Sequence, residues 1–240
     1  MNASTDTATG RGTVLIVGAG DGLSASLARR FRAEGHGVAL AARNIDKLAA
    51  LVDDTGASAH ACDASDPAAV DALFDAVVGR LDVVVYNPSA RTRGPVTELD
   101  PEAVRRALEV TAFGAFLVGQ RAAARMLEQE PVDGARGTIL FTGASAGVKG
   151  FPQSAPFAMG KFAQRGLSQS MSRELHPKGV HVAWINVDGQ IGNPRVERRP
   201  DAPDSMLEPD AIAETYVALA RQHRSAWSEE IAVRPWTERF

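Results

Sequence analysis

Cysteine and long apolar runs are almost absent from this sequence. The single cysteine, Cys62, excludes an intrachain disulfide and a metal site built from several cysteines. The five histidines are scattered without the spacing of metal ligands, so we expect no metal centre. No apolar run approaches the roughly 20 residues that span a bilayer, and residues 1–10 lack the apolar core of a signal peptide. We therefore expect a cytoplasmic protein that does not bind membranes.

An excess of charge of one sign is also missing. The formal net charge is -3 and both signs are spread along the chain, so the composition gives no sign of a nucleic-acid partner. Hydrophobic residues make up 45% of the 240 residues, which suits a globular protein with a sizeable core. We find no internal repeat or linker. We predict a flexible N-terminus over residues 1–11 and one domain over residues 12–240.

The sequence does contain a regular alternation of strand-like and helix-like segments. Short apolar runs are typical of buried parallel strands, and apolar residues spaced three and four apart are typical of helices. The predicted strands are residues 13–17, 37–42, 57–61, 82–86, 137–142, 180–187 and 230–234. The predicted helices are residues 24–34, 101–129, 154–175 and 209–222, with two shorter ones that begin near Asn44 and at Asp66-Pro67. This alternation predicts a single α/β domain with a doubly wound, Rossmann-like parallel sheet.

A glycine-rich loop follows the first predicted strand. Gly18, Gly20 and Gly22 stand between that strand and a helix, where glycines let the backbone approach a pyrophosphate at the positive end of the helix. The usual G-x-G-x-x-G spacing is not met, because Leu23 and Ser24 follow Gly22. A tight strand-to-helix turn is the alternative interpretation. The position at the first strand–helix junction favours a nucleotide site.

The end of the second predicted strand indicates which dinucleotide binds. A carboxylate there would bind the ribose 2′-hydroxyl of NAD, whereas an arginine can hold a 2′-phosphate. The sequence has Arg43 and no carboxylate at this point, which favours NADP. Asp21, an acid in the glycine loop, is a contrary sign, and a solvated Arg43 is the alternative reading.

Residues 190–207 are rich in proline, arginine and aspartate and have no apolar period. The segment is too long for a simple connection, so we predict a lid over a small-molecule substrate. A disordered surface loop is the alternative.

Taken together, the glycine loop, Asp63, Tyr86-Asn87-Pro88-Ser89, a long helix and Phe157-x-x-x-Lys161 occur in an order that resembles the short-chain dehydrogenase/reductase family along nearly the whole chain. The resemblance implies that Asp63 contacts the adenine and that residues 187–191 close over the nicotinamide. Two of the four positions of the family's loop motif match. The cofactor-binding residues expected from the loop, Arg43 and the resemblance are Gly18, Gly20, Asp21, Gly22, Leu23, Arg43, Asp63, Ala64, Asn87, Lys161, Gly189 and Ile191.

The same resemblance locates the expected catalytic positions, and most carry other residues. Gly150-Phe151-Pro152 and Lys161 fix the register of the active-site helix, which puts Ala144 at the catalytic serine and Phe157 at the tyrosine. Ser145 lies one place later than the serine, and Thr111 stands at the catalytic asparagine. Lys161 alone matches, and the resemblance implies that it holds the nicotinamide ribose.

Loss of these hydroxyls argues against ordinary ketone reduction. Removing one preorganised donor to a developing oxyanion costs on the order of 10²–10³ in rate. Hydride addition to an iminium ion forms no oxyanion, and Phe157 and Phe151 would suit such a cation. Asp188 would add negative charge near the nicotinamide. Both features also have simpler readings, as core aromatics and as a turn cap.

Three further alternatives stay open. The hydroxyls of Ser145, Ser154 and Tyr86 are other candidate proton routes, with Tyr86 pointing into the cofactor cleft. A non-catalytic NADP(H)-binding sensor or scaffold is the contrasting class of protein. An oxidoreductase of another mechanism is the third. The resemblance also implies a homodimer or homotetramer formed through the two long helices. The aromatic C-terminal tail, residues 230–240, packs either on a neighbouring subunit or on its own domain.

Overall fold

Seven parallel strands form the centre of the computed structural model, which describes residues 11–192, 200–202 and 204–238. The strand order is β3-β2-β1-β4-β5-β6-β9, so the direction of winding reverses between β1 and β4. The strands of this sheet are β1 (Thr13–Val17), β2 (Gly37–Ala42), β3 (Ser58–Ala61), β4 (Leu81–Tyr86), β5 (Gly137–Thr142), β6 (Val180–Val187) and β9 (Glu230–Val233). The predicted doubly wound sheet is confirmed, and each predicted strand is present to within a residue.

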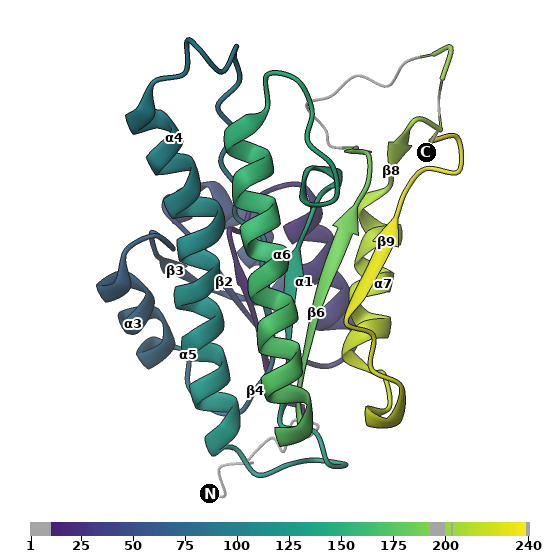
Figure 1. Ribbon diagram of the computed structural model, residues 1–240. Helices are drawn as coiled ribbons and strands as arrows, with labels where there is room; N and C mark the ends of the chain where they lie inside the picture. Colours follow the sequence, from purple (N-terminus) through teal and green to yellow (C-terminus); the bar gives the residue numbers. More distant parts are fainter. Residues whose placement is uncertain (1–10, 193–199, 203, 239–240) are drawn as a thin grey trace, which may run out of the picture.

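Helices cover both faces of the sheet (Figure 1). One face carries α1 (Leu23–Ala33), α2 (Ala49–Thr55) and α7 (Pro209–Ala220). The other carries α3 (Pro67–Ala76), α4 (Pro101–Leu108), α5 (Gly114–Glu128) and α6 (Ala155–Leu175), with α5 and α6 side by side. None of the helices in the described part of the chain has both the length and the apolar character needed to cross a bilayer.

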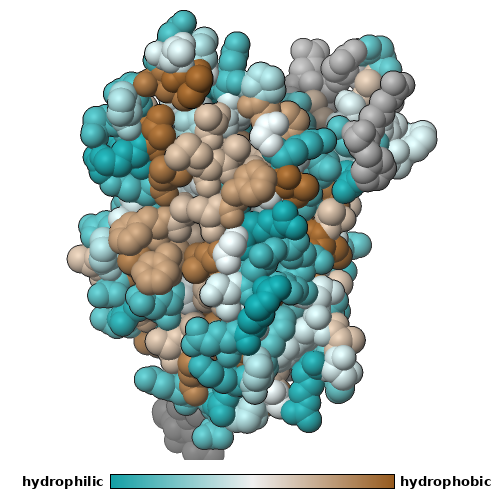
Figure 2. All heavy atoms as spheres, viewed as in Figure 1, coloured by the Kyte–Doolittle hydropathy of each residue, from teal (hydrophilic) through white to brown (hydrophobic). Residues whose placement is uncertain are grey.

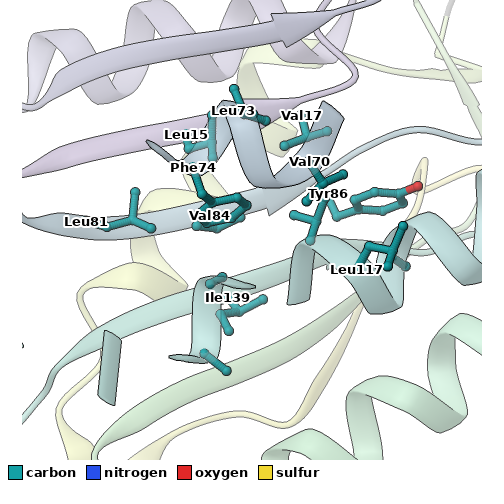
Figure 3. Close-up of a cluster of buried hydrophobic side chains, with 14 of the residues drawn as sticks. Leu15, Val17, Val70, Leu73, Phe74, Leu81, Val84, Tyr86, Leu117 and Ile139 are labelled. Atoms are coloured by element: carbon teal, nitrogen blue, oxygen red, sulfur yellow. The ribbon is translucent and has the colours of Figure 1, made fainter. Parts of the chain in front are cut away.

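Strand residues alternate between two apolar cores. Leu15 and Val17 of β1 point into the core under α3, α5 and α6, whereas Val14 and Ile16 point into the core under α1, α2 and α7. Figure 3 shows the first core, where side chains from the strands meet those of α3 and α5. Because both faces are buried, these strands read as continuous apolar runs.

The predicted helix starts at Asp66 and Asp100 are present. The Asp66 carboxylate accepts a hydrogen bond from the Ala68 N–H, and Asp100 accepts from the N–H groups of Glu102 and Ala103. A proline occupies the first turn in both helices, as its missing N–H permits.

The predicted continuous helix over residues 101–129 is interrupted. A five-residue π-helical turn, η2 (Glu109–Phe113), separates α4 from α5. The wide turn leaves two carbonyls to accept bonds from buried side chains: Val110 O accepts from the Tyr86 hydroxyl, and Thr111 O accepts from the Gln164 amide. Side chains from other elements thus bond to the turn, and the apolar period along the helix does not indicate them.

Two short strands close the carboxyl end of the sheet. β7 (Gln190–Ile191) pairs in parallel with β8 (Met206–Leu207), which joins the two ends of the predicted lid. Residues 193–199 and 203 of that lid lie outside the described residues, as do residues 1–10 of the predicted flexible N-terminus. In the C-terminal segment, the Trp236 indole donates to Asp204, while its ring is 83% exposed.

Candidate functional site

A cavity of about 490 Å³ opens at the carboxyl ends of β1, β2 and β4, which we call the glycine-loop cavity. This is the point where the winding of the sheet reverses, the usual binding position in open α/β sheets. Its lining includes seven of the predicted cofactor residues: Gly18, Gly20, Asp21, Arg43, Asp63, Ala64 and Asn87.

The glycine loop has the shape of a phosphate cradle. Gly18 has φ +81°, and a Cβ there would lie 2.7 Å from the Pro88 ring, so glycine is required. A Cβ on Gly20 or Gly22 would meet no atom within 4 Å, so the space before these residues is open. No side chain caps the start of α1, and its first turn has no acidic residue. Backbone N–H groups and the helix dipole are therefore available to an anion.

A short hydrogen-bond chain fixes the loop against β4. The Asn87 amide donates to Ser24 Oγ at 2.8 Å, and Ser24 Oγ donates to Gly18 O at 3.1 Å. Asn87 therefore holds the loop as well as lining the cavity. This role of Ser24 was not predicted from the sequence.

Two basic side chains line the glycine-loop cavity beyond the end of β2. Arg43 and Lys47 both line it, and Lys47 was missed from the sequence although it lies four residues after Arg43. Asp63 accepts bonds from the Ser65 hydroxyl at 2.6 Å and the Ser65 N–H at 3.0 Å. These bonds, with the nearby Arg43, lower the pKa of Asp63. A 2′-phosphate would meet two cations here.

A second cavity of about 700 Å³, the lysine cavity, adjoins the first through their shared residues Asn87 and Ser89. The other five predicted cofactor residues line it: Gly22, Leu23, Lys161, Gly189 and Ile191. A third cavity of about 330 Å³, the phenylalanine cavity, includes Phe151, Pro152 and Ser154. The lysine and phenylalanine cavities share Arg91, Arg93, Ser145 and Phe157. The three cavities are thus neighbours, and we refer to them together as the cleft.

Lys161 is the buried cation of this cleft. Its Nζ donates to Thr142 O at 2.5 Å and to Gln164 Oε1 at 3.3 Å. An ammonium has three N–H donors, so one is left for a ligand. Burial, with a smaller contribution from the Arg91 guanidinium, lowers the pKa of Lys161 to about 7. Lys161 therefore changes its charge near neutral pH.

Of the other predicted catalytic residues, one lines the cavities and two do not. Ser145 lines both the lysine and the phenylalanine cavity. Thr111 lines none of the three cavities: its side chain is buried, and its hydroxyl accepts the Ala90 N–H at 3.1 Å. Asp188 lines none of them either, and its carboxylate pairs with Arg234 at 3.5 Å. Thr111 and Asp188 thus lie outside the lining of these cavities, and their catalytic roles stay predictions.

Both tyrosines of the chain are buried, and their hydroxyls are hydrogen-bonded. The Tyr86 hydroxyl donates to Val110 O, and the Tyr216 hydroxyl shares a 2.8 Å bond with Thr142 Oγ1. Burial raises the pKa of each. The expectation that Tyr86 points into the cofactor cleft was wrong, because its ring packs in the core under α3 and α5 (Figure 3).

Two arginines in the cleft were missed. Arg91 and Arg93 follow β4, and the Arg91 guanidinium carbon lies 4.2 Å from the centroid of the Phe157 ring. The signal was present as Arg91-Thr92-Arg93 just after a buried strand, at the edge of the sheet where ligands bind. Elsewhere, no group of three His, Cys, Asp or Glu side chains within the described ranges is placed to hold a metal ion.

The family model for short chain dehydrogenases matches residues 12–191 of this chain. The chain therefore belongs to the short-chain dehydrogenase family. This family assignment agrees with the single Rossmann-like domain and identifies the protein as a member of an oxidoreductase family.

Three known proteins illustrate the range of its relatives. A short-chain dehydrogenase from Rhodopseudomonas palustris is 34% identical with a TM-score of 0.80, over 94% of this chain and 99% of the other. A metagenomic short-chain oxidoreductase in complex with NADP is 28% identical with a TM-score of 0.79, over 93% and 96%. A cyclic-di-GMP-binding biofilm dispersal mediator protein of Escherichia coli is 30% identical over 71% of this chain and 69% of the relative.

Proposed function

We propose that this short-chain dehydrogenase is an NADP-dependent oxidoreductase that acts without a tyrosine proton donor. One observation carries the proposal: all twelve predicted cofactor residues line the glycine-loop and lysine cavities, which adjoin each other. The lysine cavity contains Lys161 and no tyrosine. The protein thus has the residues expected to bind the dinucleotide. A group other than a tyrosine has to supply the proton.

The preference for NADP rests on the charges at the end of β2. Arg43 and Lys47 line the cavity there, and the strand is followed by Arg43-Asn44 with no carboxylate to bind a ribose 2′-hydroxyl. The nearby Asp63 is already bonded to Ser65. A structure of a relative in complex with NADP supports the same choice.

Bound NADPH supplies the hydride. Within the protein, Lys161 Nζ is the group that can hold the proton for the product, because a pKa of about 7 is matched to proton transfer at neutral pH. Its bonds to Thr142 O and Gln164 Oε1 fix the ammonium beside the cavity.

The lost hydroxyls leave an apolar surface. Ala144, Ala146 and Phe157 form a small buried cluster, so the two positions assigned to the family's serine and tyrosine pack together without a polar atom. A positive charge takes the place of a hydroxyl donor in the lysine cavity, because the Lys161 ammonium lines it with one N–H left for a ligand. Such a fixed charge stabilises an oxyanion as it develops.

These charges disfavour the iminium hypothesis. Arg91, Arg93 and Lys161 line the lysine cavity, and none of the described residues that line it is Asp or Glu. Two like charges 4 Å apart repel by about 4 kcal/mol at an effective dielectric constant near 20. A cationic substrate would meet this repulsion, so we favour a carbonyl substrate that does not need the tyrosine.

The test begins with titrations of NADPH and NADH, followed by hydride transfer to a panel of ketones, keto acids and cyclic imines. We expect NADPH to bind more tightly, and carbonyl reduction to fall as the pH rises through about 7, because Lys161 then loses its proton. A flat profile between about pH 6 and 8 would refute the role of Lys161. Turnover of imines alone would restore the iminium hypothesis.

A second candidate function is a non-catalytic NADP(H)-binding sensor or scaffold. The apolar Ala144–Phe157 cluster favours it, and so does the relative described as a cyclic-di-GMP-binding mediator of biofilm dispersal. Tight NADPH binding without hydride transfer to any compound of the panel would establish this alternative.

We also propose a homodimer or homotetramer that forms through α5 and α6. Exposed apolar side chains gather on this face of the molecule (Figure 2), and they include Phe113, Phe116, Met159 and Phe162. Patches of this kind mark subunit contacts. We expect Phe116→Glu to shift sedimentation toward the monomer, whereas Val78→Glu, at an exposed position after α3, leaves it unchanged.

A further inference from the structure

We propose that Arg91 and Arg93 form an anion-binding subsite beside Phe157, and that the substrate carries a carboxylate which binds there. The inference rests on the proposed function, because it names the substrate class of the same cleft. Both arginines line the lysine cavity and the phenylalanine cavity. A ligand held by them therefore lies between the two cavities.

The first step is the geometry of Arg91. Its guanidinium lies against the face of the Phe157 ring, with 4.2 Å between the guanidinium carbon and the ring centroid. A contact with a ring face restrains the guanidinium while leaving its N–H groups unused. Among the residues that the structure describes, none accepts a hydrogen bond from Arg91 or Arg93. A planar fork of unused donors matches the two oxygens of a carboxylate.

The second step is the absence of a neutralising charge. Within the described part of the chain, no carboxylate lies within ion-pair distance of Arg91 or Arg93, and neither cavity is lined by Asp or Glu. Arg165 provides an internal comparison: its guanidinium also lies over a ring, that of Trp184 at 5.3 Å, but it makes two 2.8 Å bonds to Glu230. Arg91 has no such partner among the described residues and is exposed, so its N–H groups are open to a ligand that enters the cavity.

The third step is the mutual repulsion of the cations. Burial and the neighbouring Arg93 lower the pKa of Arg91, and Arg91 in turn contributes to the lowered pKa of Lys161. An anion bound between the two arginines would offset this repulsion. The site thus favours a ligand of the opposite charge.

The fourth step is the size and character of the phenylalanine cavity. Its volume is about 330 Å³, at the lower end for small-molecule pockets, and Ala146, Phe151, Pro152 and Phe157 supply apolar walls. The carboxylate is therefore attached to a small apolar or aromatic group. We infer a carbonyl compound of this type, for which benzoylformate is a suitable probe and its methyl ester a neutral control of nearly the same shape.

The experiment is calorimetric titration of the full chain, saturated with NADP⁺, with either compound. Because the cofactor and the probe are both oxidised, binding is measured without turnover. We expect benzoylformate to bind at least about tenfold more tightly than the methyl ester, the effect of one charge-assisted hydrogen-bonded pair. We expect Arg91→Met and Arg93→Met each to remove about tenfold of the acid's affinity and to leave the affinities for the ester and NADP⁺ unchanged. The affinity of Arg91→Lys for the acid should lie between that of the native protein and that of Arg91→Met.

Arg106→Met is the matched control. Arg106 is an exposed arginine of α4 that lines none of the three cavities, so its loss changes the net charge equally and should leave the acid's affinity unchanged.

Three results would overturn the subsite: equal affinity for acid and ester, full acid affinity in Arg91→Met, or binding of neither compound while NADP⁺ still binds. Inorganic phosphate that binds as tightly as benzoylformate would overturn the assignment to a carboxylate. Failure of NADP⁺ to bind is a separate outcome, which refutes the proposed function itself.

Discussion

The glycine-loop cavity and the lysine cavity meet at Asn87 and Ser89, but backbone and side chains contribute differently to their linings. Much of the first surface is backbone: the turn at Gly18 and the uncapped start of α1. The second is formed largely by side chains, with Lys161 and Arg91 as its charges. The first surface therefore depends more on the path of the backbone, and the second more on individual side chains.

This contrast bears on the proposed function, in which the glycine-loop cavity binds the cofactor and the lysine cavity works without a tyrosine. Dinucleotide binding depends on a loop shape that glycine and the sheet impose. Proton transfer and charge stabilisation depend on individual functional groups, which change independently of the fold. Four substitutions test whether the two cavities can be separated in this way.

The largest effect is expected from Lys161→Met. Loss of a positioned proton donor should lower turnover by about 10²–10⁴-fold at saturating NADPH, measured with the best carbonyl acceptor of the panel. Lys178→Met is the control, because Lys178 is exposed and pairs with Glu174 on the same helix end. Turnover within about threefold of the native rate would show that the proton comes from elsewhere.

Lys161 also predicts a pH dependence of stability. Its pKa falls from 10.5 to about 7 on folding, so the unfolded chain binds more protons between these values. The free energy of unfolding of the native protein, relative to Lys161→Met, should therefore rise with pH from about 7 toward 10.5 and be flat below 7. Urea titrations of both proteins across this range measure the difference, and a constant difference would contradict the buried position of the ammonium.

Gly18→Ala tests the glycine-loop cavity, as Lys161→Met tests the lysine cavity. A left-handed φ costs a residue with a Cβ roughly 1–2 kcal/mol, and the contact with Pro88 adds to this. We expect the NADPH dissociation constant to rise about tenfold or more, measured by cofactor fluorescence. Gly166→Ala, where a Cβ meets no atom within 4 Å, is the matched control. Equal affinity in both variants would mean that the loop does not bind the pyrophosphate.

Arg43→Ala is expected to have a smaller, selective effect. Loss of one charge-assisted contact should weaken NADPH binding by about tenfold and leave NADH binding unchanged. Arg29→Ala, an exposed site on α1, controls for the change in net charge. Parallel losses for both cofactors would assign Arg43 to the shared part of the dinucleotide.

Phe157→Tyr should have the smallest effect, a change of less than about threefold in turnover. Ala144 supplies no second hydroxyl, and Arg91 already lies against the ring. A tenfold gain would instead show that the missing hydroxyl limits the reaction.

The sequence predicts the sheet and the glycine-loop cavity well, for a physical reason. Buried strands read as apolar runs, and Gly18 and Arg43 stand directly at strand ends, so their positions follow from local patterns. The π-helical turn at Thr111 could not be predicted in this way, because it depends on Tyr86 and Gln164 in distant elements.

Side-chain contacts between distant parts of the chain were missed from the sequence. Asp188 lies within the expected nicotinamide segment, residues 187–191, and Arg234 from the far end of the chain pairs with it. Arg91 becomes notable only once the fold brings it onto Phe157. Side-chain direction in loops is set by tertiary contacts, which a single sequence does not display.

The π-helical turn η2 connects an exposed face of the molecule to the cleft through hydrogen bonds. Phe113 is exposed at one end of this turn, and Thr111 O at its centre accepts from Gln164, whose Oε1 accepts from Lys161 Nζ. A subunit that docks on Phe113 and shifts the turn would change the proton affinity of Lys161. By reciprocity, protonation of Lys161 would change the strength of association by the same factor. Subunit association and the protonation of Lys161 would then be linked by a single coupling free energy.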